Sequence, residues 1–188
     1  MGLAFGGCKK ENTVKIGGVI WATRNVGMSG TFAATPQDAG MFYQWGSKIG
    51  WSNKNPLTAT DGSNIWRDIS ETGNVWLSEN NSCPKGWRVP TQTELQSLAN
   101  AGSEWTTVEG VFGRKFGAGA QTVFLSAAGF RYYNTGNIVE WTGTFGSYWS
   151  STATGADAYY LDFAERHGAN SDYFHYRTNG FPVRCVKE

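Results

Sequence analysis

The stretch CPKGWRVPTQTELQSL, residues Cys83 to Leu98, decides how the middle of this chain folds. Thr91 is followed three residues later by Glu94, which is the spacing of a capping box. In that motif the threonine hydroxyl accepts a hydrogen bond from the third amide of the helix, and the glutamate accepts one from the N-cap amide. We therefore predict a helix over residues 91–100, with its two leucines facing the core.

A second informative stretch, NGFPVRCVKE, lies at the carboxyl end over residues Asn179 to Glu188. Each stretch contains one cysteine, and Cys83 and Cys185 are about a hundred residues apart. A disulfide between them would close a loop of about a hundred residues, which chain-entropy reasoning values at about 4 to 5 kcal/mol. Such a bond implies an exported protein. The alternative is two free buried thiols, and thiol titration of unfolded protein with and without reductant distinguishes the two.

Both stretches belong to a series of blocks that recur in one order in a known family. The other blocks are IGGVIWATRNVG (16–27), the WG of FYQWGSKIGW (42–51), AAGFRYYNTG (127–136) and YWSSTA (148–153). In these blocks the chain resembles the Fibrobacter succinogenes major paralogous domain, a family of exported bacterial domains. RVPTQTEL and GFPVRCV are also similar to formylglycine-generating enzymes. The resemblance implies an α+β domain with the C-type-lectin-like fold, built from short twisted antiparallel strands, one or two helices and long loops.

Length and charge limit the function further. The 188 residues suit a single domain over residues 13–188. Sixteen basic and fifteen acidic side chains nearly cancel, and no basic stripe interleaves with aromatic residues. We therefore expect no nucleic-acid partner.

Residues 1–12 read as a signal remnant and tether. Small residues precede Cys8 and a polar segment follows it, which looks like the end of a lipoprotein signal whose cysteine receives lipid. Only seven residues precede Cys8, without a charged region or a full apolar core, so an accidental likeness is the alternative. The prediction is an exported lipoprotein of the outer membrane or cell surface that touches the membrane only through its lipid.

Strand signals dominate the rest of the chain. Gly17-Gly18 between two alternating segments predicts a hairpin. Residues 27–82 read as long loops pinned by tryptophans, with a second short helix possible over 36–46. Further strands are expected, by their β-branched and aromatic residues, within the segments 122–132, 147–152, 158–163 and 182–187.

Few residues offer catalytic chemistry. His167 and His175 are the only histidines, and neither stands beside cysteines at zinc spacing. Formylglycine-generating enzymes use a cysteine pair near the active site, whereas the cysteines here are expected to form a disulfide or to carry lipid. Their oxidase activity is therefore not carried over to this chain. Acidic side chains between Asp157 and Asp172 could offer calcium ligands, but their spacing matches no calcium loop. We predict no catalytic residue, no metal and no cofactor.

Residues 151–180 stand apart in composition. They contain one residue from the set Glu, Lys, Gln, Trp and Met, namely Glu165, against thirty-one in residues 1–150. Codons that end in a pyrimidine cannot encode the missing types. Such codons result when diversity-generating retroelements randomise the adenines of asparagine codons, although loop composition alone could produce the same bias.

These observations predict a non-catalytic ligand-binding domain, lectin-like, that recognises a carbohydrate or a surface protein through its aromatic-rich carboxy-terminal region. A retroelement-diversified receptor, an enzyme of the formylglycine-generating superfamily and a structural surface module are the alternatives. In the strand 158–163 we expect Tyr159, Leu161 and Phe163 to share the face that packs inward. Ala158, Tyr160 and Asp162 share the other face, which we expect to leave Tyr160 and Asp162 pointing outward. The predicted binding residues are Thr152, Thr154, Asp157, Tyr160, Asp162, Arg166, His167, Tyr173, His175, Tyr176 and Thr178.

Overall fold

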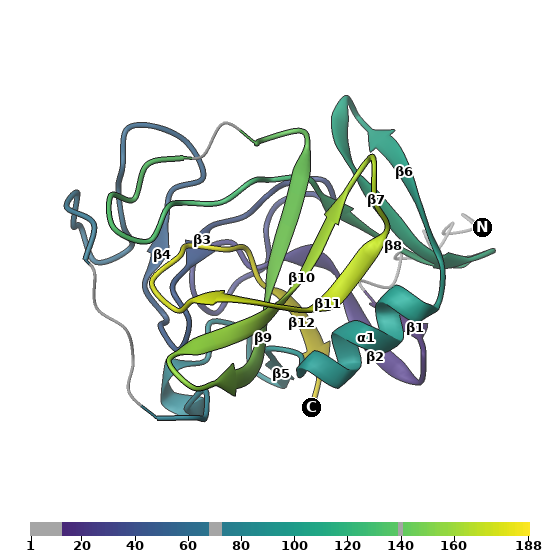
Figure 1. Ribbon diagram of the computed structural model, residues 1–188, viewed down its shortest axis with the longest axis horizontal. Helices are drawn as coiled ribbons and strands as arrows, with labels where there is room; N and C mark the ends of the chain where they lie inside the picture. The colour runs from purple at the N-terminus through teal and green to yellow at the C-terminus, as the bar shows by residue number, and fades with distance from the viewer. Residues whose placement is uncertain (1–12, 68–72, 139–140) are drawn as a thin grey trace, which may run out of the picture.

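Figure 1 shows the computed structural model of the chain, which describes residues 13–67, 73–138 and 141–188. Strands make up 45% of the described residues and helices 7%. They form four separate antiparallel sheets with one α-helix, a mostly β and β-sandwich-like arrangement. The predicted α+β class with a C-type-lectin-like fold is therefore wrong. The predicted tether and the lipidation of Cys8 lie outside the described residues.

The described elements follow one another along the chain as β1 (Thr13–Ile16), β2 (Val19–Asn25), β3 (Phe42–Tyr43), β4 (Gly50–Trp51), the 3-10 helix η1 (Ser78–Asn80), β5 (Trp87–Arg88), α1 (Gln92–Asn100), β6 (Ser103–Val108), β7 (Val111–Ala118), β8 (Gln121–Ser126), β9 (Phe145–Thr154), β10 (Asp157–Ala164), β11 (Ala169–Tyr176) and β12 (Arg184–Lys187).

Of the two helices considered from the sequence, the structure contains the one that starts at Thr91 and not the one over residues 36–46. The capping box predicted for α1 is present, because the Thr91 hydroxyl accepts from the Glu94 amide and the Glu94 carboxylate accepts from the Thr91 amide. The second helix, considered over residues 36–46, is absent. Gly40 there has a left-handed φ of 69°, and a Cβ on it would lie 2.0 Å from the Val26 carbonyl oxygen.

One four-stranded sheet, in the order β1-β2-β12-β5, holds both ends of the described chain together. The predicted hairpin is confirmed: β1 pairs with β2 across Gly17 and Gly18, whose φ values of 59° and 83° suit a tight turn. Strand β12 lies between β2 and β5, and a disulfide joins its Cys185 to Cys83, with 6.1 Å between the Cα atoms. The carboxyl end of the domain is thus clamped, as the sequence predicted.

A second sheet, β11-β10-β9, carries helix α1 on one face (Figure 1). Leu161 and Phe163 of β10 are fully buried in the same apolar cluster as Leu95 and Leu98 of the helix. The predicted inward side of β10 is confirmed for Leu161 and Phe163, whereas Tyr159 is only partly buried and Ala158 of the other face is fully buried. The opposite face of this sheet, which does not meet the helix, forms the site described below.

The remaining sheets are the meander β6-β7-β8 and the small pair β3-β4. The β6–β7 hairpin was not predicted, because the sequence of β6, SEWTTV, does not alternate between apolar and polar residues. Strand β11 was also missed, since it is rich in polar residues. The expected strand within 122–132 ends as β8 at Ser126, and the strands expected at 147–152, 158–163 and 182–187 lie within β9, β10 and the β12 region.

Candidate aromatic binding site

The pairing of three strands gathers polar and aromatic side chains on the sheet face opposite α1. Tyr160 pairs with Trp149 on one side and with Tyr173 on the other. Asp162 pairs with Ser147. Directly paired residues of antiparallel strands project to the same face, so these five side chains stand together. Tyr160 and Asp162 were expected to point outward, but they are largely covered by segments from elsewhere in the chain.

Aromatic rings follow one another across this face as a continuous series, here called the aromatic arc. The arc consists, in order, of Phe145, Trp141, Phe130, Phe181, Tyr160 and Tyr173. Neighbouring ring centroids lie 5.0, 5.5, 5.3, 5.0 and 6.4 Å apart along it. These are contact distances for aromatic pairs, so the rings support one another.

Two polar residues, His167 and Asp162, continue the arc beyond Phe145. The His167 ring lies 5.7 Å from the Phe145 ring, and its Nε2 atom lies 3.6 Å from Oδ2 of Asp162. Inside lies an open cavity of about 410 Å³, the aromatic cavity, which is lined by the arc and by Tyr132, Ser147, Asp162 and His175. Its size is in the range of small-ligand pockets.

Burial sets the electrostatics of the cavity. Asp162 is 9% exposed, and burial raises the pKa of its carboxyl above the ordinary value, with the charge of His167 acting in the opposite direction. Burial lowers the pKa of His175, opposed by the charge of Asp157. Burial also raises the pKa of the Tyr160 phenol. The cavity is therefore a poorly solvated place where a carboxylate lacks strong stabilisation.

Two short chain segments bring the central rings of the arc together. Arg131 and Gly180 exchange backbone hydrogen bonds of 2.9 and 3.0 Å, which places the neighbouring Phe130 and Phe181 in contact. The buried Arg131 guanidinium donates to the carbonyl oxygens of Ser52, at 2.6 Å, and of Lys54, at 2.7 Å. This arginine therefore anchors the wall of the cavity to the long loop around residue 53.

The structure unites some of the predicted binding residues and separates the others. Tyr160, Asp162, Tyr173 and His175 line the aromatic cavity, and His167 stands beside Asp162. The remaining predicted residues lie elsewhere, and are Thr152, Thr154, Asp157, Arg166, Tyr176 and Thr178.

Several of these have other contacts. The Thr152 hydroxyl accepts from the Gln92 amide at the start of α1, and Thr178 is buried with its carbonyl accepting from Gln44. The Tyr176 ring contacts Tyr133 outside the cavity, with 4.7 Å between ring centroids. Thr154 and Asp157 are the paired ends of β9 and β10 at their turn, and Arg166 is exposed.

Sequence reasoning missed the part of the site that comes from outside β10 and β11, which is six of the ten lining residues. These residues are Phe130, Tyr132, Trp141, Phe145, Ser147 and Phe181. Phe130 and Phe181 lie in the blocks AAGFRYYNTG and GFPVRCV, which carry the family resemblance. The glycine that adjoins each phenylalanine was a usable signal, because glycines allow two backbones to approach closely.

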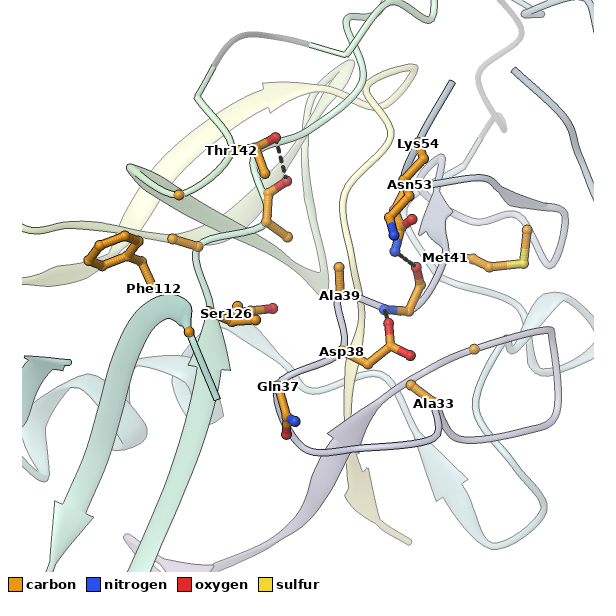
Figure 2. Close-up of a pocket in the computed structure, with 17 residues that line it drawn as sticks. Ala33, Gln37, Asp38, Ala39, Met41, Asn53, Lys54, Phe112, Ser126 and Thr142 are labelled. Atoms are coloured by element: carbon orange, nitrogen blue, oxygen red, sulfur yellow. Dashed lines mark hydrogen bonds between the residues drawn. The ribbon is translucent and has the colours of Figure 1, made fainter. Parts of the chain in front are cut away.

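A larger cavity, of about 730 Å³, lies elsewhere, between the loops around residues 27–41 and 53–54 and the start of β7. Figure 2 shows the Asn53 amide and the Asp38 carboxylate both turned onto the backbone of Gly40, where they form hydrogen bonds of 2.7 and 2.9 Å. The Thr142 hydroxyl likewise donates to the Ala128 carbonyl. These polar groups tie loops together, so the aromatic cavity is the better candidate for ligand binding.

Two further properties concern metals and membranes. Among residues 13–67, 73–138 and 141–188, no three His, Cys, Asp or Glu side chains come together to hold a metal ion. Within the same ranges no helix is long and apolar enough to span a bilayer.

Comparison with known proteins adds one similarity. The family described as a domain of unknown function, DUF8237, matches residues 118–186, well under half of the chain. The matched segment runs from the end of β7 into β12 and contains every residue that lines the aromatic cavity. No curated protein and no solved structure matches the chain.

Proposed function

We propose that this protein is a non-catalytic binding domain whose ligand enters the aromatic cavity. The observation that carries the proposal is the enclosure of hydrogen-bonding groups by aromatic rings. The Tyr160 hydroxyl, the Ser147 hydroxyl and the Asp162 carboxylate all line the cavity, and none forms a hydrogen bond with another described residue. Polar groups left unpaired in an apolar cavity are suited to bind a ligand that supplies the missing partners.

The ligand we propose is a carbohydrate or a surface protein. Exposed rings at the rim, Tyr173 and Trp141, offer flat apolar faces for either. Rigid aromatic side chains among small polar ones lose little conformational entropy when they bind.

We place the domain outside the cytoplasm, on an outer membrane or cell surface, attached through lipid on Cys8. The disulfide between Cys83 and Cys185 supports an oxidising compartment. The ordered sequence blocks that resemble the Fibrobacter succinogenes major paralogous domain support membership of that exported family.

A retroelement-diversified receptor is a second candidate. The biased segment 151–180 supplies Tyr160, Asp162, Tyr173 and His175 to the cavity, so variation there would change the ligand. Sequencing the DNA beside the gene tests this candidate. A near-copy of the segment that differs mainly at adenines, next to a reverse transcriptase gene, is expected. Absence of such a copy would leave a fixed binding surface.

Two adjacent tyrosine and phenylalanine residues allow a matched test of the site. Tyr173 is 51% exposed and lines the cavity, whereas Phe174 is 56% exposed and contacts Tyr159 on the other face of the sheet. Glycan and surface-protein arrays should identify a ligand for the native protein. Tyr173→Ala should then abolish its binding and Phe174→Ala should leave it unchanged, with both variants folded. Equal binding by Tyr173→Ala would contradict the placement.

A further inference from the structure

Building on the proposed function, we infer that the aromatic cavity recognises a primary alkylammonium group, the lysine side chain of a polypeptide ligand. The cavity combines a buried acceptor of negative charge, aromatic ring faces and hydrogen-bond acceptors. Each of these features selects a different part of a lysine side chain.

The negative charge comes from Asp162. Its side chain is 13% exposed, and the carboxylate accepts no hydrogen bond from the described residues. The Nε2 atom of His167 lies 3.6 Å from its Oδ2 atom, beyond ordinary hydrogen-bond length. An ionised carboxylate in such surroundings gains strongly from a cation that enters the cavity.

The rings supply the second element. Tyr160, Trp141 and Tyr173 line the same cavity as the carboxylate, and the last two are 45% and 51% exposed, so their rings are accessible to a ligand. Ring faces attract a cation through their quadrupole, and this attraction grows when the site excludes water. They also provide an apolar surface along which an alkyl stem can pack.

The hydrogen-bonding groups favour a primary ammonium over a quaternary one. A lysine ammonium has three hydrogens to donate and accepts none. The lining offers acceptors from three side chains, Asp162, Ser147 and Tyr160, which are free of hydrogen bonds among the described residues. A sugar hydroxyl would use these acceptors too, but it would not neutralise the carboxylate.

A small lysine analogue and its uncharged counterpart test the inference. Nα-acetyl-lysine methylamide is titrated into the whole protein while the indole N–H signal of Trp141 is followed by NMR. Nα-acetyl-norleucine methylamide, which has a similar stem and no charge, is the control. We expect saturable shifts with the lysine compound in the millimolar range, on the order of 4 kcal/mol of binding free energy. The norleucine compound should bind more weakly than the lysine compound by a factor of roughly ten at least.

Asp162→Asn keeps the shape of the side chain and removes its charge. We expect this variant to bind the lysine compound about 30-fold more weakly, while its weak binding of the norleucine compound stays the same. Equal binding of both compounds by the native protein, or equal binding of the lysine compound by native and Asp162→Asn proteins, would overturn the inference.

Glucosamine, a sugar with a primary ammonium, distinguishes the source of the cation. Tighter binding of glucosamine than of the lysine compound would overturn the assignment to a polypeptide. If no ammonium compound binds while an array ligand still depends on Tyr173, the inference fails and the proposed function stands. If the array ligand also ignores Tyr173→Ala, the proposed function fails as well.

Discussion

The Asp162 carboxylate lies 3.6 Å from the His167 imidazole and accepts no hydrogen bond from the described part of the chain. A buried carboxylate normally has several such bonds. The ionised form of Asp162 is therefore destabilised in the folded protein, and burial raises the pKa of its carboxyl for the same reason.

We predict that Asp162→Asn raises the stability of the protein while weakening ligand binding. Removing a poorly solvated charge should stabilise the fold by about 1 kcal/mol, a rise of about 2 to 4 °C in Tm for a chain of this size. Thermal unfolding followed by circular dichroism measures it. Asp172→Asn, on the exposed part of the neighbouring strand, is the control and should change stability by less than about 0.5 kcal/mol.

The gain in stability from Asp162→Asn should depend on pH. Burial raises the pKa of Asp162 in the folded state above its value in the unfolded chain. The folded protein thus binds that proton more tightly, and stability falls as pH rises from the unfolded to the folded pKa. The advantage of Asp162→Asn should be full at neutral pH, above the folded pKa. It should vanish in acid below the unfolded pKa. An advantage that grew in acid would contradict this account of Asp162.

Local signals in the sequence were sufficient for some elements and not for the site. Thr91 with Glu94 and Gly17 with Gly18 determine their own helix start and turn, because the interacting groups are within a few residues. The aromatic cavity depends instead on the Arg131–Gly180 pairing across the chain, which no local pattern shows. The fold class was wrong because many short strands with one or two helices were assigned to an α+β domain, in agreement with the resemblance, and the β6–β7–β8 meander was not recognised.

Removal of the disulfide should destabilise the domain strongly. Cys83 and Cys185 are both buried and join segments 102 residues apart. We expect replacement of both by serine to cost about 3 to 5 kcal/mol, measured by guanidinium unfolding. Comparison in a Cys8→Ser background avoids exchange with a third thiol. A loss below about 1 kcal/mol would mean that β12 is held by its strand pairing alone.

Gly146→Ala should disturb the apolar core between helix α1 and the β11-β10-β9 sheet, on the face opposite the aromatic cavity. A Cβ at this position would lie 2.0 Å from the tip of the buried Phe163 ring, which packs against Tyr148 and Phe116. The ring cannot move without repacking the core, so we expect a loss of at least about 1 to 3 kcal/mol. Gly168→Ala is the control, because its Cβ would meet nothing within 4 Å. Chemical denaturation of both variants measures the difference, and equal stability would contradict the packing described.

Arg131→Lys should weaken binding by loosening the wall of the cavity, although Arg131 does not line it. Its guanidinium donates to Ser52, Lys54 and Gly136 at once, through nitrogens arranged in a fixed plane. Lysine keeps the charge but cannot reach all of these acceptors, so some carbonyl groups would stay buried and unpaired. We expect a loss of about 2 to 4 kcal/mol in stability.

Below the melting transition, ligand affinity should also fall, because Phe130 beside Arg131 is no longer fixed against Phe181. NMR of the Trp141 indole, whose ring contacts Phe130, would report that loosening directly. An unchanged indole signal together with unchanged affinity would show that the wall is positioned by the Arg131–Gly180 backbone pairing and not by the guanidinium.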